Sequence, residues 1–175
     1  GQKSAFPISV SMPLGSGPFP AEQFMPWLAN LLPESHLTEI SQRLRQSPQD
    51  VIGILQNIGR DTAGAMSIGA PRKSGNNFMP ISNAAALKKI LDELPKKPFL
   101  VGERGVSMSL AGVQDKLPVF IETDGTMGIP VDGTPSTHII KPDTKRLKGS
   151  VQNEAFCMRL AAACGFDAAE VDTGK

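Results

Sequence analysis

The sequence lacks an excess of charge of either sign: 18 Lys and Arg residues stand against 17 Asp and Glu residues among 175. A net charge of +1 gives no global field that would draw the chain to nucleic acid or to a membrane surface. No apolar run approaches the roughly 18 residues of a membrane-spanning helix, and we expect no signal peptide. We therefore expect a cytoplasmic protein that contacts no membrane and is not a strongly basic nucleic-acid binder.

Cysteine and histidine are scarce as well. The two cysteines, Cys157 and Cys164, lie seven residues apart in a segment that we predict to be helical. Seven residues of helix separate two Cα atoms by roughly 10 Å, which is too far for a disulfide. We expect both to be reduced thiols in the core, as in a cytosolic protein. The two histidines, His36 and His138, are scattered and give no zinc-binding spacing, so no metal site is predicted.

What is present is typical of a soluble globular chain. Apolar residues make up 40% and charged residues 20% of the sequence, which is enough to bury a core. The 17 glycines and 15 prolines are above average, but they fall short of the content of a disordered chain. A length of 175 residues suits one domain of ordinary size or two small ones.

The first half of the chain is predicted to mix helices and strands. Apolar and polar residues alternate over Ala5–Met12, which predicts a strand. Four later stretches carry apolar residues every three to four positions, which predicts helices. The further expected elements are a helix through Phe24–Leu32 with Pro26 at its first turn or at a kink, a helix that carries Leu37, Ile40 and Leu44 and is capped by Ser35, a helix that is capped by Ser47, has Pro48 as its first residue and is ended by Gly59, a short strand over Gly64–Gly69, and a helix with Leu87 and Leu94 capped by Ser82.

The second half is predicted to open with strands. Pro95–Pro98 breaks the helical pattern, and we expect a domain boundary there, between residues 1–97 and 98–175. The expected elements are a strand over Leu117–Glu122, a tight turn at Asp124–Gly125, a return strand over Met127–Val131, a strand over Thr137–Lys141, and a helix capped by Ser150 that runs to Cys164 and stops at Gly165. The resulting fold class is α+β.

One loop has the composition of an anion-binding site. Small residues at Ser109, Ala111 and Gly112 would let backbone N–H groups approach an anion, and Lys116 would supply a compensating charge. The phosphate-loop pattern with two glycines before Lys-Ser/Thr is absent, however. A strand followed by an ordinary surface loop therefore stays open as an alternative.

A second candidate is the lysine at the end of the predicted strand over Thr137–Lys141. Thr137, Ile139 and Lys141 share one face of a strand, so Lys141 would lie beside apolar neighbours and need an anionic partner. Glu154, 13 residues further on in the predicted helix, is a candidate partner. A strand lysine paired with a helix glutamate is the arrangement of kinase N-lobes. A strand-end lysine that reaches into solvent remains an equal alternative.

These motifs resemble those of a known family. Ser109–Lys116 resembles the Ser-x-Ala-Gly-x-Gln-(Glu/Asp)-Lys loop of HipA-type toxin kinases, and Thr137–Lys141 resembles their ATP-binding lysine strand. Asn153–Glu154 matches the Asn-Glu pair that follows that strand. In the first half, Leu31–Ser35 and Ile58–Ala65 resemble the N-terminal subdomain of the family. These matches occur in the family's order and cover nearly the whole chain, so together they are specific.

The resemblance implies a fold and an activity. It implies a mixed N-terminal subdomain over 1–97, incomplete at its start, followed over 98–175 by the N-lobe of a protein-kinase-like fold. The C-lobe, with the acidic residues that hold Mg²⁺ and orient the nucleophile, is absent, so we expect no catalytic residue in this chain and no phosphotransfer by it alone. The resemblance implies that the whole protein is an ATP-dependent serine/threonine kinase and the toxin of a type II toxin–antitoxin system.

The resemblance also implies partners and a biological effect. The expected protein substrate is a translation component such as glutamyl-tRNA synthetase, whose phosphorylation arrests growth and favours persistence. The expected partner is a helix-turn-helix antitoxin of the HipB type, which would bring the toxin to operator DNA.

Roles for individual residues follow from the same resemblance. Lys141 would hold ATP phosphates and Glu154 would orient Lys141. Ser109 would be a regulatory autophosphorylation site, because a phosphate adds roughly −1.5 to −2 charge to the loop and would favour a loop swung out of the site; the alternative is a serine that only satisfies a nearby backbone group. The residues expected to cover the ATP phosphates through backbone N–H groups are Leu110, Ala111, Gly112, Val113, Gln114, Asp115 and Lys116.

Other functions stay open at this stage. A non-catalytic regulatory or binding module that pairs with a separate kinase chain or antitoxin would need no catalytic lobe. A lipid kinase would share the lysine-strand design, and a purely structural fragment would use none of these motifs.

Overall fold

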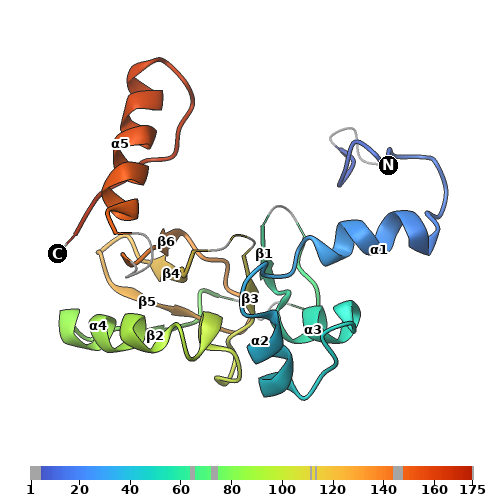
Figure 1. The fold of residues 1–175 in the computed structure, drawn as a ribbon, viewed down its shortest axis with the longest axis horizontal. Coiled ribbons are helices and arrows are strands. Elements are labelled where there is room, and N and C mark those ends of the chain that lie inside the picture. Colours follow the sequence, from blue (N-terminus) through green and yellow to red (C-terminus); the bar gives the residue numbers. More distant parts are fainter. Residues whose placement is uncertain are drawn as a thin grey trace. The chain divides into compact units, whose positions relative to one another are not determined.

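The computed structural model of the chain has an α+β fold, as the sequence predicts (Figure 1). It describes residues 5–63, 66–71, 75–110, 112, 114–143 and 148–174. Packing divides the chain into two compact units, Gly1–Ile139 and Ile140–Lys175.

Helices α1 (Ala21–Ala29), α2 (Leu37–Leu44) and α3 (Val51–Ile58) open the first unit, and all three coincide with helices predicted from the apolar spacing. Each turns apolar residues to one face, so that Ile40 of α2 is completely buried. Pro26 lies inside α1 rather than in its first turn. Both α1 and α2 contact α3, which makes α3 the centre of this helical part.

The caps of two of these helices differ from the sequence prediction. The carboxylate of Asp50 accepts the Gly53 N–H at 2.9 Å and caps α3, while Ser47 belongs to the turn before it. Helix α2 begins after His36, whose backbone is left-handed with φ 62°, and not after Ser35. Several polar residues compete at each boundary, and the backbone conformation at the boundary decides between them.

The N-cap of helix α4 (Ala84–Glu93) also lies one residue after the predicted one. Its N-cap is Asn83, whose side chain accepts the Ala86 N–H at 2.9 Å, where the sequence predicted Ser82. The proline-rich stretch then breaks the helical pattern, as expected. It leads into a short 3-10 turn, Pro98–Leu100, whose three residues are buried.

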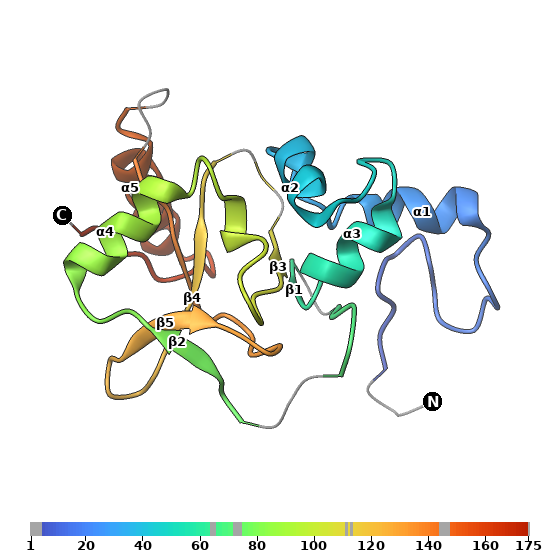
Figure 2. The same ribbon diagram turned by 90° about the horizontal axis from the view of Figure 1, so that it is seen from below.

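A two-stranded parallel sheet joins β1 (Asp61–Thr62) to β3 (Met108–Ser109). In Figures 1 and 2 this pair lies between the three N-terminal helices and the larger sheet. The predicted strand over Gly64–Gly69 is wrong: residues 66–69 form no strand, and residues 64 and 65 lie outside the described part. The Thr62 hydroxyl donates to the Met66 carbonyl at 2.6 Å, so Met66 lies close to the end of β1.

The larger sheet has the strand order β2-β5-β4-β6. β4 (Leu117–Ile121) and β5 (Met127–Pro130) form the predicted antiparallel hairpin, and β2 (Phe78–Pro80) pairs antiparallel with β5. β6 (His138–Ile140) is the predicted lysine strand, which ends just before Lys141. β2 lies before the boundary expected after residue 97 and pairs with β5, which lies after it. The boundary itself stays a prediction.

The hairpin turn forms as its sequence predicts. The Gly125 N–H donates to the Glu122 carbonyl at 3.0 Å, and Gly125 has the left-handed φ of 88° that favours glycine. The Asp124 carboxylate accepts the Thr126 N–H at 2.8 Å. This hydrogen bond is the main cause of a pKa below the ordinary value for Asp124.

The predicted N-terminal strand is wrong. Over Ala5–Met12 the structure contains one isolated bridge, between Ser9 and Met12, which are joined by a hydrogen bond from the Met12 N–H to the Ser9 carbonyl at 3.0 Å. The segment therefore turns back on itself, and no other strand among the described residues pairs with it. An alternating pattern makes a strand only where a partner strand is available.

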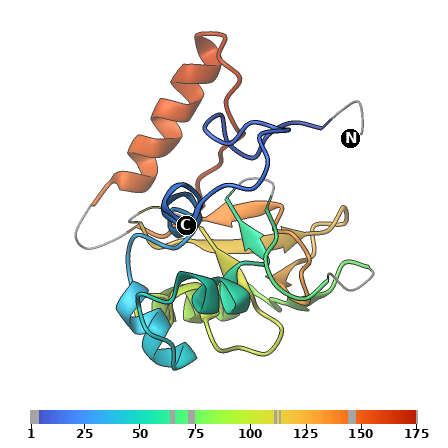
Figure 3. The same cartoon turned by 90° about the vertical axis from the view of Figure 1, so that its right-hand side faces the viewer.

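The second unit contains α5 (Ser150–Ala163) and the segment after it, which turns back along the helix (Figures 1 and 3). The helix starts after Gly149, which has φ 80°, so Ser150 is its first residue rather than its cap. Cys157 and Cys164 carry free thiols, but both are exposed, which corrects the expected core placement. Within the described residues, no helix is long and apolar enough to span a membrane.

Candidate functional site

Ser109 ends β3 and is the most deeply buried of the predicted site residues. It has no exposed surface, and its hydroxyl donates to the Leu31 carbonyl at 2.5 Å. Leu31 follows α1 and is itself buried. The sequence places Ser109 at the start of the candidate phosphate loop, and the structure adds that its side chain bonds to a backbone group 78 residues away.

The loop after Ser109 packs around a lysine. Gly112 has φ +111°, a conformation that L side chains rarely adopt, and a Cβ atom there would lie 2.5 Å from Lys116 Nζ. The Lys116 ammonium therefore lies directly against Gly112, and the lysine is only 9% exposed. Leu110 and Gln114 are half-buried. The predicted residues Ala111 and Val113 lie outside the described part.

The far end of the loop is joined to the first helices by a residue that sequence reasoning did not single out. Asp115 Oδ1 lies 3.3 Å from Nε2 of His36, and both side chains are largely shielded from solvent. His36 directly follows the Leu31–Ser35 stretch that carries part of the family resemblance. No spacing rule connects it to the loop, so only the fold reveals the contact.

In the second unit, Lys141 forms an ion pair with Glu154, the candidate partner that the sequence analysis named. Lys141 follows β6, and Glu154 lies in the second turn of α5. About a third of each side chain is exposed, 32% for Lys141 and 36% for Glu154, so the pair is neither in the core nor fully in solvent. A strand-end lysine is thus held by a helix carboxylate, while the roles of both residues toward a nucleotide stay predictions.

The donors in the loop fit a phosphate group. Gln114 Nε2 is buried and has no hydrogen-bond partner among the described residues. The same loop carries the Lys116 ammonium beside Gly112, so it contains both a hydrogen-bond donor and a positive charge. The described residues contain no group of three or more His, Cys, Asp or Glu side chains that could hold a metal ion.

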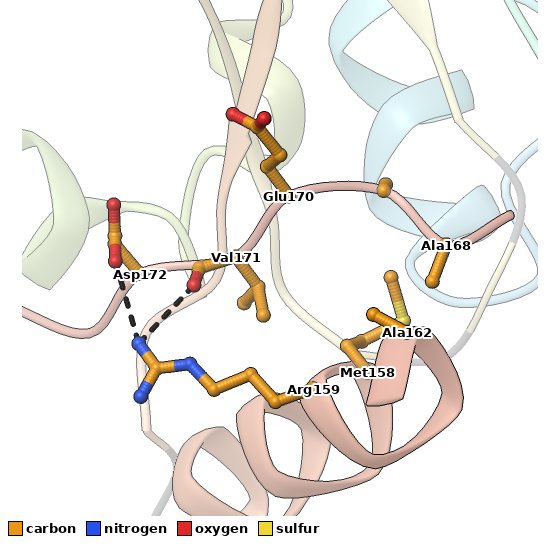
Figure 4. A pocket seen from close by; sticks show the side chains of 8 residues that line it. Met158, Arg159, Ala162, Ala168, Glu170, Val171 and Asp172 are labelled. Carbon is orange, nitrogen blue, oxygen red and sulfur yellow. Dashed lines mark hydrogen bonds and ion pairs between the residues drawn. The ribbon is translucent and has the colours of Figure 1, made fainter. Parts of the chain in front are cut away.

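Two cavities in the described structure lie away from the predicted site residues. One of about 320 Å³ lies between α5 and the segment after it, and Figure 4 shows Arg159 there, reaching the Val171 carbonyl and the Asp172 carboxylate, each at 3.3 Å. The other, of about 360 Å³, is lined by residues of α1, α2 and α3 and the turns that join them. Neither is lined by a loop residue, Lys141 or Glu154.

Comparison with known proteins points to one family. The model of the HipA N-terminal domain matches residues 1–69, and the model of the HipA-like C-terminal domain matches residues 108–175. A protein of Sinorhizobium fredii named "Putative kinase Y4mE" is 37% identical over 178 residues, which cover 97% of this chain and 42% of that protein. From the same organism, "Putative kinase Y4dM" is 29% identical over 149 residues, which cover 83% of this chain and 33% of that protein.

A solved structure gives the same result. It is the complex of HipA, HipB and operator DNA from a toxin–antitoxin system of Shewanella oneidensis MR-1, and the match has a TM-score of 0.73 with 28% identity. The match covers 99% of this chain and 40% of that chain. The chain thus spans less than half the length of the proteins that it resembles.

Proposed function

Since the chain belongs to the family of HipA-type proteins, we propose that it is the ATP-binding part of a serine/threonine protein kinase that acts as a toxin. The observation that carries the proposal is the ion pair between Lys141 after β6 and Glu154 in α5. Kinases use such a pair to hold the lysine where it meets the α- and β-phosphates of ATP. Two relatives that carry the name of a kinase support the same reading.

The loop is proposed to cover the phosphates. Its backbone N–H groups, the buried Gln114 amide and the Lys116 ammonium would donate to phosphate oxygens. When bound, ATP supplies the phosphoryl group that is transferred. No described residue of this chain is proposed as a ligand of the accompanying Mg²⁺ or as a catalytic base.

The proposed substrate is a serine or threonine of a translation protein such as glutamyl-tRNA synthetase, and the proposed outcome is growth arrest. A helix-turn-helix antitoxin of the HipB type is the proposed partner, with operator DNA bound through it. The support for this partner is that the similar solved HipA is in complex with HipB and operator DNA.

The test measures binding of an ATP analogue that resists hydrolysis, by calorimetry on the whole protein. Lys141→Ala should lower the affinity at least tenfold, because it removes a charge-assisted contact to phosphate. Lys148→Ala is the matched control: this lysine is exposed and precedes α5 in the sequence, and its loss should leave the affinity unchanged. An unchanged affinity in Lys141→Ala would remove the assignment.

A non-catalytic regulatory or binding module is the alternative candidate. Such a module would bind a separate kinase chain or the antitoxin, and it would bind no nucleotide. The same calorimetry separates the two candidates. Phosphate transfer to lipid vesicles but not to protein would instead indicate a lipid kinase.

A further inference from the structure

The candidate phosphate loop is held at both ends by residues from the first 69 positions. At its start, β3 pairs with β1, and the Ser109 hydroxyl donates to the Leu31 carbonyl. At its end, Asp115 contacts His36. The N-terminal partners all lie in the segment that matches the HipA N-terminal domain, whereas the loop residues lie in the segment that matches the HipA-like C-terminal domain.

The backbone of His36 has a fixed conformation, so its ring can hold Asp115 in place. Its carbonyl accepts the Ile40 N–H at 2.9 Å, which anchors the residue to the start of α2. Its φ of 62° is unusual for a residue with a side chain and persists only where the surroundings determine it. The ring thus projects from a fixed backbone position toward Asp115, and its second nitrogen lies 4.0 Å from Glu39.

Two described residues in the middle of the loop contribute no side-chain hydrogen bond that would fix its conformation. Gly112 carries no side chain, and the buried Gln114 amide has no hydrogen-bond partner among the described residues. A loop of this kind keeps one conformation only if its ends are constrained. Here the β1–β3 pair and Ser109 constrain one end, and the contact with His36 constrains the other.

We propose that His36 is a positioning residue for the nucleotide site: through Asp115 it holds the 110–116 loop in the conformation that receives phosphate. The N-terminal segment is then a clamp on the phosphate loop, and releasing His36 loosens the loop without unfolding the protein. The part of this inference that concerns phosphate rests on the proposed function. The part that concerns the loop's conformation does not.

The first experiment follows hydrogen exchange of the loop amides in the protein without nucleotide. In His36→Asn, asparagine tolerates the left-handed backbone but is too short to reach Asp115, so loop exchange should rise about tenfold. His36→Gln restores the reach of the donor and should return exchange most of the way to the wild-type rate. Glu39→Gln is the matched control, because it alters the other neighbour of the ring and should leave the loop unchanged.

A double-mutant cycle tests whether the effect of His36 on the loop is transmitted through Asp115. If His36 acts through Asp115, His36→Asn should have no further effect on loop exchange in an Asp115→Asn background. Equal acceleration in α2, α3 and the loop would show a general loss of structure and would overturn the positioning role. Unchanged loop exchange in His36→Asn would overturn it as well.

The second experiment measures affinity for the ATP analogue. The wild type should bind it, and His36→Asn should bind it about five- to tenfold more weakly, with no change in Tm. Faster loop exchange with unchanged affinity would refute the link between the clamp and the nucleotide. If the wild type bound no nucleotide, the proposed function would fail, while the exchange data would still decide whether the clamp exists.

Discussion

Gly112→Ala tests the loop geometry with a single methyl group. Gly112 has φ +111°, where an L residue is strained, and the new Cβ would lie 2.5 Å from Lys116 Nζ. Two atoms cannot remain that close, so the lysine must move. Since Lys116 is only 9% exposed, moving it means leaving a packed position. The substitution therefore disfavours the loop conformation in two ways at once.

The expected magnitude follows from the backbone. A residue forced into a sparsely populated φ region costs about 1–3 kcal/mol. If the loop adopts this conformation to bind phosphate, that cost is subtracted from the binding free energy. At about 1.4 kcal/mol for each factor of ten, the affinity for the ATP analogue should fall roughly 5- to 150-fold. Calorimetry on the whole protein measures this directly.

Gly102→Ala is the control that isolates the effect. Gly102 also has a left-handed φ, +93°, but a Cβ there would meet no atom within 4 Å, and the residue is exposed and outside the loop. It should lower the free energy of unfolding and leave nucleotide affinity unchanged. The reasoning fails if Gly112→Ala binds within twofold of the wild type, or if Gly102→Ala loses as much affinity.

Two further predictions concern Ser109 and the larger sheet. Ser109→Asp would place a carboxylate in a fully buried position facing the Leu31 carbonyl, so it should weaken binding of the ATP analogue more than Ser109→Ala does in calorimetry; equal affinities would argue against electrostatic expulsion of the loop. Gly128→Ala would bring a Cβ to 2.3 Å from Phe78 Cδ2 and 2.6 Å from the Met79 carbonyl oxygen, so urea unfolding should show a loss of about 1–3 kcal/mol. An unchanged unfolding midpoint in Gly128→Ala would contradict the β2–β5 register.

Sequence reasoning predicted what depends on neighbours along the chain. The β4–β5 hairpin follows from Asp124–Gly125 between two apolar runs, and α3 follows from its apolar spacing. The N-cap of α3 is Asp50 and not the predicted Ser47, because both residue types are good N-caps and the two stand three residues apart. β1 and β2 were missed because strands of two or three residues are too short to show an alternating pattern.

In the candidate site, too, contacts between neighbouring elements were easier to predict than contacts between distant segments. Lys141 and Glu154 lie on successive elements, so their spacing made Glu154 a candidate partner, although a lysine that reaches into solvent was an equal alternative until the fold showed the ion pair. The bond from Ser109 to Leu31 could not, because nothing local in either stretch indicates a partner 78 residues away. The core placement of Cys157 and Cys164 was inferred from residue type, and it failed because Cys157 in α5 and Cys164 directly after α5 are both exposed.

The two-residue pairing of β1 with β3 also bears on the order in which the protein folds. Helices α1 to α3 need only neighbouring residues, so they can form as soon as the first 60 or so positions have left the ribosome. Asp61 and Thr62 must then wait for Met108 and Ser109, which are synthesised much later. Pairings between distant segments close long loops and form slowly. We therefore expect the 110–116 loop to be among the last parts of the first unit to take shape, after the N-terminal helices have already formed.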